Sequence, residues 1–163
     1  MFVGDERVSE DVIDGYVEGI VDLRVEQGED LAIHDFAEDR EQAVIYVLYA
    51  ELGRAADLGP VDTAGAADEF EELYLEAAGY YEAIMTASEP RELTQAEMEA
   101  LVAAAAEDPG LAGATVTDLQ MLAGFTDDLA AYVDEYDIAV NPRYGDFDLS
   151  PLPSIFPVEV PQR

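Results

Sequence analysis

Apolar side chains recur at intervals of three or four residues in five successive segments of this 163-residue chain. In the first segment, for example, Ile13, Tyr16 and Ile20 fall on one face of a helical wheel. This spacing is typical of the buried side of an α-helix, whereas a half-buried strand would show strict alternation. The pattern therefore predicts a mainly α fold of about five helices.

Start and stop signals delimit the first two helices. Ser9 is a suitable N-cap for the first helix, and Gly28 is a suitable C-cap. Gly15 and Gly19 each weaken that helix by about 1 kcal/mol relative to alanine, unless close packing requires them. The second helix is expected from Phe36 to Ala56, and its broad apolar band makes it the candidate central helix of the core.

The remaining three helices follow breaks in the chain. The third is expected to begin at Asp62 or Thr63 and to end before Pro90. The fourth begins with a capping box, in which Thr94 is followed three residues later by Glu97. For the fifth helix, which should extend to Tyr136, the sequence Thr117-Asp118-Leu119-Gln120 predicts a second capping box.

Both ends of the chain are expected to be extended, at residues 1–8 and 137–163, within a single domain that spans residues 1–163. Prolines at 151, 153, 157 and 161 exclude a helix near the C-terminus. Residues 155–160 have the composition of one edge strand, where proline is tolerated.

The charge of the chain restricts its partners. There are 38 aspartates and glutamates against seven arginines and no lysine, which gives a formal net charge of −31. Nucleic acids and anionic membranes require a basic patch, so this balance argues against both as direct partners. Half of the residues are hydrophobic, which a folded domain needs. The acidity is typical of proteins from salty habitats, where ions screen the repulsion between carboxylates.

Few residues are suited to catalysis. His34 is the single histidine, cysteine is absent, and no glycine-rich phosphate loop with its lysine occurs. Glu69 and Glu72 have the i, i+3 spacing with which all-α phosphohydrolases hold magnesium, and Asp127-Asp128 or Asp134/Asp137 would have to supply the second acidic pair. Accidental pairs are numerous in so acidic a chain, so we expect no catalytic residue, no metal and no cofactor.

Aromatic residues are the better candidates for a functional surface. Adjacent residues of a helix point to different sides, so Tyr80 and Tyr81 cannot both point squarely into one core. Some rings of this pair and of the pair Tyr46 and Tyr49 are therefore expected to line a groove or the surface. Tyrosine makes adaptable contacts in binding sites, and methionine adapts to varied partners. Tyr46, Tyr49, Tyr80, Tyr81 and Met85 are therefore the predicted peptide-binding residues.

Two segments of the sequence resemble one known family. The opening residues Val3-Gly4-Asp5-Glu6-Arg7-Val8-Ser9 are similar to the entry of SurA-type N-terminal domains. The segment Tyr136-Asp137-Ile138-Ala139-Val140-Asn141-Pro142-Arg143-Tyr144-Gly145 resembles the closing motif of SurA-N-like lipoproteins of actinobacteria. Within this closing motif, Asn141, Pro142, Arg143 and Tyr144 are expected to be structural, since Pro142 forces an extended backbone at Asn141.

The resemblance implies a helical domain like the SurA N-terminal or trigger-factor peptide-binding fold. It also implies that residues 2–8 and 138–140 pair as short strands. Export is implied as well, usually as a lipid-anchored protein, although the chain has no signal peptide, lipobox cysteine or membrane-spanning segment of its own. There is no room for the parvulin domain of full-length SurA, so prolyl isomerase activity is not expected.

The sequence thus favours a non-catalytic, extracytoplasmic module that binds extended or unfolded polypeptide, or a partner protein. An acidic rim would favour basic segments of that polypeptide. The main alternative is a structural or assembly subunit whose exposed aromatic residues form an oligomer interface. A metal-dependent phosphohydrolase and an acidic mimic of DNA are further alternatives.

Overall fold

The computed structural model describes the chain except for residues 4–5, 29, 32–35, 108–110, 112 and 143–146. Its described part is mainly helical, which confirms the predicted fold class. The helices are α1 (Glu10–Glu26), α2 (Phe36–Ala55), α3 (Glu69–Ala87), α4 (Gln95–Glu107) and α6 (Val116–Glu135). The strands are β1 (Phe2–Val3), β2 (Glu6–Arg7), β3 (Phe147–Asp148) and β4 (Glu159–Val160).

Helix α2 is the centre of the core, as its broad apolar band predicts. Its middle residues are buried on several sides, because α1 and α3 both pack against it and the C-terminal segment covers it. Close approach to α3 depends on Gly53, where a Cβ atom would lie 2.0 Å from Cγ of Tyr80. The core continues through α3 to α6, where Tyr81 lies edge-on against the ring of Phe125 with 5.0 Å between ring centroids.

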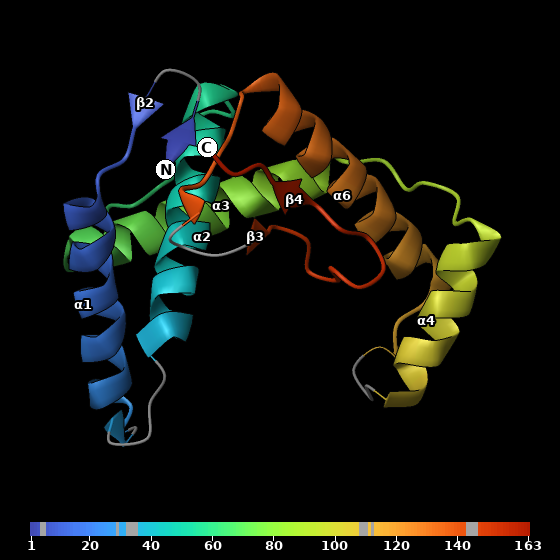
Figure 1. Ribbon diagram of the computed structural model, residues 1–163, viewed down its shortest axis with the longest axis horizontal. Helices are drawn as coiled ribbons and strands as arrows, with labels where there is room; N and C mark the ends of the chain where they lie inside the picture. Colours follow the sequence, from blue (N-terminus) through green and yellow to red (C-terminus); the bar gives the residue numbers. More distant parts are fainter. Residues whose placement is uncertain (4–5, 29, 32–35, 108–110, 112, 143–146) are drawn as a thin grey trace.

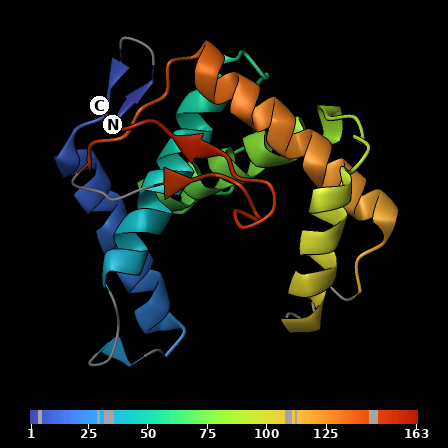
Figure 2. The ribbon, with the colours of Figure 1, turned by 45° about the vertical axis from the view of Figure 1, so that its right-hand side comes forward.

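The expected pairing of residues 2–8 with 138–140 is not among the strand pairs of the described residues. β1 pairs antiparallel with β2, and β3 pairs antiparallel with β4, so each short ladder lies within one terminal segment. Val140 makes an isolated bridge with Gln162, since its backbone bonds to the carbonyl of Pro161 and the amide of Arg163. The two termini nevertheless lie side by side (Figures 1 and 2).

Two predicted helix starts also need correction. The third helix is expected to begin at Asp62 or Thr63, but α3 begins at Glu69 with Asp68 as its N-cap. The carboxylate of Asp62 instead accepts a hydrogen bond from the amide of Ala64 in a turn. The last helix begins at Val116, so its capping box is formed by Thr115 and not by Thr117. The predicted strand at residues 155–160 is reduced to β4.

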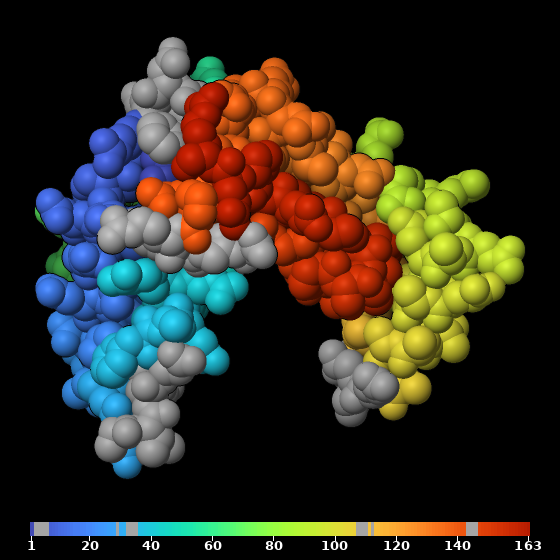
Figure 3. Space-filling view, viewed as in Figure 1, coloured from blue at the N-terminus to red at the C-terminus, as the bar shows by residue number. Residues whose placement is uncertain are grey.

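Helix α4 stands apart from α1 and α2, and the molecule has the outline of an arch (Figures 1 and 3). A small second cluster of apolar residues, which includes Leu101, Ala123 and Phe156, joins α4 to α6 and to the C-terminal loop. The connection from α3 to α4 crosses α6 at Gly124, where a Cβ atom would lie 1.9 Å from the carbonyl oxygen of Glu89.

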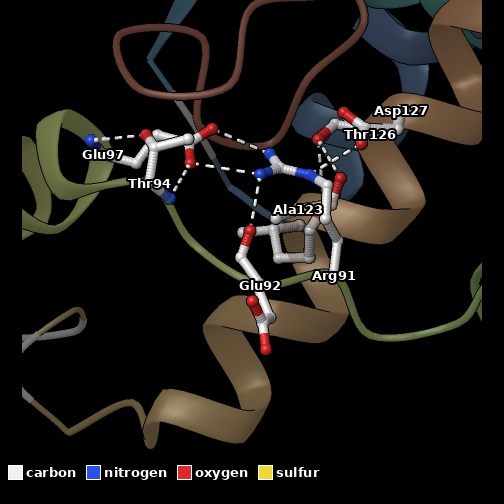
Figure 4. A network of polar contacts seen from close by, with 8 residues as sticks. Arg91, Glu92, Thr94, Glu97, Ala123, Thr126 and Asp127 are labelled. Carbon is white, nitrogen blue, oxygen red and sulfur yellow. Dashed lines mark hydrogen bonds and ion pairs between the residues drawn. The ribbon is translucent and has the colours of Figure 1, made fainter.

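Arg91 fixes this connection between helices (Figure 4). Its guanidinium group donates to both carboxylate oxygens of Glu97, at 2.8 and 3.1 Å, and lies 2.6 Å from Oδ2 of Asp127 on α6. Its backbone amide donates to the carbonyl of Gln120, also on α6. Glu97 at the same time accepts from the amide of Thr94, which completes the predicted capping box. One side chain therefore joins the start of α4 to α6.

Candidate functional site

An open hollow of about 620 Å³ lies between three helices of the described structure. One part of the lining comes from residues within 19–27, in α1 and directly after it. α2 contributes Gln42 and Tyr46, and the start of α3 contributes residues within 67–74. The hollow is therefore lined by the last turns of α1, by one face of α2 and by the first turns of α3. We call it the aromatic hollow, because three rings line it.

The three rings are those of Tyr46, Phe70 and Tyr74. The rings of Tyr46 and Tyr74 meet edge to face, with 5.4 Å between centroids and 74° between planes. The ring of Phe70 is tilted against that of Tyr46, with 6.4 Å between centroids and 46° between planes. Edge-to-face contacts of this kind are favourable because the positive edge of one ring meets the negative face of the other.

Local packing explains how these rings are held. Phe70 fits against α1 only because residue 19 is glycine, where a Cβ atom would lie 2.6 Å from Cβ of Phe70. The hydroxyl of Tyr46 accepts a hydrogen bond of 2.6 Å from Nε2 of Gln42, one turn earlier on α2. Burial raises the pKa of Tyr46 above its ordinary value, so the ring remains neutral at physiological pH. Tyr74 is 45% exposed and forms the outer edge of the cluster.

Carboxylates surround the rings. Asp22 and Glu26 belong to α1 and are exposed, whereas Asp68 and Glu71 belong to the start of α3. Asp68 accepts from the amide of Glu71 at 2.8 Å, and Glu71 accepts from the amide of Ala67 at 2.6 Å. These two acids therefore satisfy free amides at the start of α3 and also set the position of Phe70.

Among the described residues, Arg24 is the one cation that lines the aromatic hollow. Its Nε atom lies 2.8 Å from Oδ1 of Asp39, whose side chain is fully buried in α2. The positive charge of the guanidinium group is therefore balanced by a buried carboxylate of α2, and the pair connects α1 to α2. A buried carboxylate requires such a partner, because an isolated buried charge is strongly unfavourable.

Of the five residues predicted to bind peptide, Tyr46 alone lines the aromatic hollow. Tyr49 is buried and donates a hydrogen bond of 2.9 Å to the carbonyl of Leu149. Tyr80 is buried against Gly53, while Tyr81 and Met85 are partly buried and pack against the core. The structure therefore does not bring the five side chains together on one open surface.

Phe70 and Tyr74 belong to the aromatic hollow but were not predicted as site residues. Their i, i+4 spacing places them on one face of a helix, which the sequence equally explains as part of the core. A weak signal was available in Gly19, since a glycine inside a helix often marks a close approach by another side chain. That signal does not say which side chain approaches.

The acidic residues considered for magnesium binding are spread over the molecule. Glu69 and Glu72 line a shallow hollow with Glu76, whose carboxylate binds the guanidinium of Arg54. Asp127 pairs with Arg91, and Asp137 pairs with Arg163 at 2.9 Å. Among the described residues, no three carboxylates or histidines gather in a way that could hold a metal ion.

Three residues discussed from the sequence, His34, Arg143 and Tyr144, lie outside the described part of the chain. Asn141 and Pro142 are described, and they follow directly on the bridge between Val140 and Gln162. This position at the exit from a short β contact is the one that their sequence predicts.

Exposed apolar residues also occur on α1, at Val12, Leu23 and Val25, and on α4. Val102 is 69% exposed, Met98 lies one turn before it on the same side, and Val116 at the start of α6 is also exposed. None of the helices in the described parts of the chain is long and apolar enough to cross a membrane.

Comparison with known proteins gives no relative for this chain: no family model matches it, and no curated protein or solved structure is significantly similar to it.

Proposed function

We propose that this chain is a non-catalytic module that binds extended or unfolded polypeptide outside the cytoplasm. The aromatic hollow is the observation that carries the proposal, because it presents ring surface to solvent between three helices. The resemblance of the two terminal motifs to SurA-type domains supports the same function and adds the extracytoplasmic location. Peptide binding needs no reactive group.

The aromatic hollow has the properties of a surface that accepts varied side chains. Tyrosine supplies a large, rigid ring at a small cost in conformational entropy, and its hydroxyl keeps the rim polar. A volume of about 620 Å³ is within the range of known ligand pockets.

The proposal is tested by the aggregation of an unfolded client protein at moderate salt. An excess of the wild-type chain should slow aggregation, and Tyr74→Ala should weaken this effect because it removes the most exposed ring of the hollow. Tyr132→Ala on α6 is the matched control, since Tyr132 stacks on Tyr136 and does not line the hollow. Aggregation that is equally fast with and without the wild-type chain would reject the proposal.

Assembly of several copies is the second candidate function, and the exposed side of α4 favours it. Met98 and Val102 are exposed there, at 37% and 69%. Sedimentation over a range of protein concentrations would distinguish the candidates. A stable oligomer that Val102→Asp converts to a monomer would favour assembly, whereas a monomer throughout would favour peptide binding.

A further inference from the structure

We propose that the aromatic hollow binds the cationic side chain of a lysine or arginine in the bound polypeptide, an inference that rests on the proposed function. The hollow joins three aromatic rings to four carboxylates. Rings alone would accept any apolar side chain, and carboxylates alone would attract any cation without orienting it. Their combination selects a side chain with a long apolar stem and a positive head.

The rings provide the first part of this recognition. A cation that lies over an aromatic face is attracted by the negative charge of that face, most strongly where water is excluded. Because Tyr46 and Tyr74 meet at 74°, they present differently directed surfaces to the same hollow. The methylene groups of lysine or arginine can pack on one ring while the head approaches the other.

The charges provide the second part. Asp22 and Glu26 are one helical turn apart and exposed, and they lie in the last turns of α1. The C-terminal end of a helix carries a partial negative charge, which adds to that of the two carboxylates. The start of α3 also lines the hollow, and amides there bond to the carboxylates of Asp68 and Glu71.

Arg24 does not cancel this attraction. Its charge is balanced by the buried carboxylate of Asp39 at 2.8 Å, which does not itself line the hollow. The four lining carboxylates therefore leave an excess of negative charge. An anionic side chain would be repelled here both by these groups and by the net charge of −31.

The test compares three dye-labelled extended peptides that differ at one central position, which is lysine, glutamine or glutamate between apolar residues. Fluorescence anisotropy measures their affinity for the full chain in about 0.15 M salt, where charges more than about 8 Å apart are screened. We expect the lysine peptide to bind about tenfold more tightly than the glutamine peptide, and the glutamate peptide to bind most weakly.

Variants locate the preference in the hollow. Tyr74→Leu keeps apolar surface but removes the ring, and the pair Asp22→Asn with Glu26→Gln removes two lining charges. Each should reduce the preference for the lysine peptide over the glutamine peptide from about tenfold to about twofold. Glu82→Gln with Asp128→Asn is the matched control, since it changes the net charge equally at exposed positions outside the hollow. The control should retain the full preference.

Two results would overturn the inference in different ways. Equal affinity for the three peptides, or an equal loss of preference in the two double variants, would reject cation recognition by the hollow and leave polypeptide binding intact. Failure of all three peptides to bind would reject the proposed function and this inference with it.

Discussion

The hydroxyl of Tyr49 donates a hydrogen bond to the carbonyl oxygen of Leu149, 2.9 Å away and 100 residues later in the chain. Tyr49 lies in the middle of the central helix α2, and Leu149 follows directly on β3. Both residues are buried, so water cannot replace either partner. This bond attaches the proline-rich C-terminal segment to the core.

Tyr49→Phe should lower the free energy of unfolding by about 1 to 2 kcal/mol, because the carbonyl of Leu149 is left buried without its donor. Urea denaturation followed by circular dichroism measures this. Tyr74→Phe is the control, since Tyr74 is largely exposed, and it should change stability by less than about 0.5 kcal/mol. Equal effects of the two substitutions would contradict the role given to the bond.

Gly53→Ala and Gly15→Ala should change stability in opposite directions, although both replace glycine inside a helix. At Gly53 a Cβ atom would lie 2.0 Å from Cγ of Tyr80, so the ring must move, at a cost of about 2 kcal/mol or more. At Gly15 a Cβ atom would have no atom from another part of the described chain within 4 Å, and alanine should stabilise α1 by about 0.5 to 1 kcal/mol. Thermal unfolding of the two variants provides the measurement, and a gain at both positions would contradict the packing of Tyr80 on α2.

The sequence was most informative where local interactions decide the structure. The expected second helix, Phe36 to Ala56, differs from α2 by one residue, because a long run of helix-forming residues needs no partner to be recognised. The capping box of Thr94 and Glu97 also forms as predicted. At α6, Thr115 and Thr117 both have a suitable partner three residues on. The carboxylate of Asp118, a stronger acceptor than the amide of Gln120, selects Thr115.

The candidate site was less predictable, because it depends on which helices meet. Tyr80 appeared free to line a groove, but Gly53 on a different helix provides the space that buries it. The periodicity of α3 equally explains Phe70 and Tyr74 as core residues, but the hollow between α1, α2 and α3 leaves part of their surface open. Neither relationship is contained in the periodicity of a single helix.

The contribution of Glu97 to stability should depend on pH. Hydrogen bonds from Arg91 hold the pKa of Glu97 at about 2 in the folded protein, below the ordinary 4.5. A folded-state pKa that is depressed gives stability that is fully present above about pH 4.5 and is lost as the pH falls toward 2. The difference in unfolding free energy between the wild type and Glu97→Gln should therefore shrink over this range.

Urea denaturation at several pH values, from neutral to about 2.5, measures that difference. Comparing the two chains cancels the general effect of protonating the many other carboxylates, which both share. The control compares Arg91→Gln with the double variant Arg91→Gln, Glu97→Gln over the same pH range. The difference in unfolding free energy between these two chains should change little with pH. A difference that persists unchanged without Arg91 would assign the pKa of Glu97 to another cause.

Salt should stabilise the protein, although it weakens the ion pairs seen in the structure. Several arginines each bind a carboxylate, namely Arg24, Arg40, Arg54, Arg91 and Arg163. These pairs involve few of the 38 acidic residues. The Debye length falls from about 10 Å at 0.1 M salt to about 3 Å at 1 M, so repulsion among the remaining carboxylates is screened more than attraction at contact distance. The melting temperature at neutral pH should therefore rise between about 0.1 and 1 M sodium chloride. At about pH 4, where many carboxylates are protonated, the same increase in salt should raise it much less.

Calorimetry measures the melting temperature in both series. A melting temperature that does not change with salt at neutral pH would show that the carboxylates are too far apart to repel one another, and it would remove the physical basis for adaptation to a salty habitat.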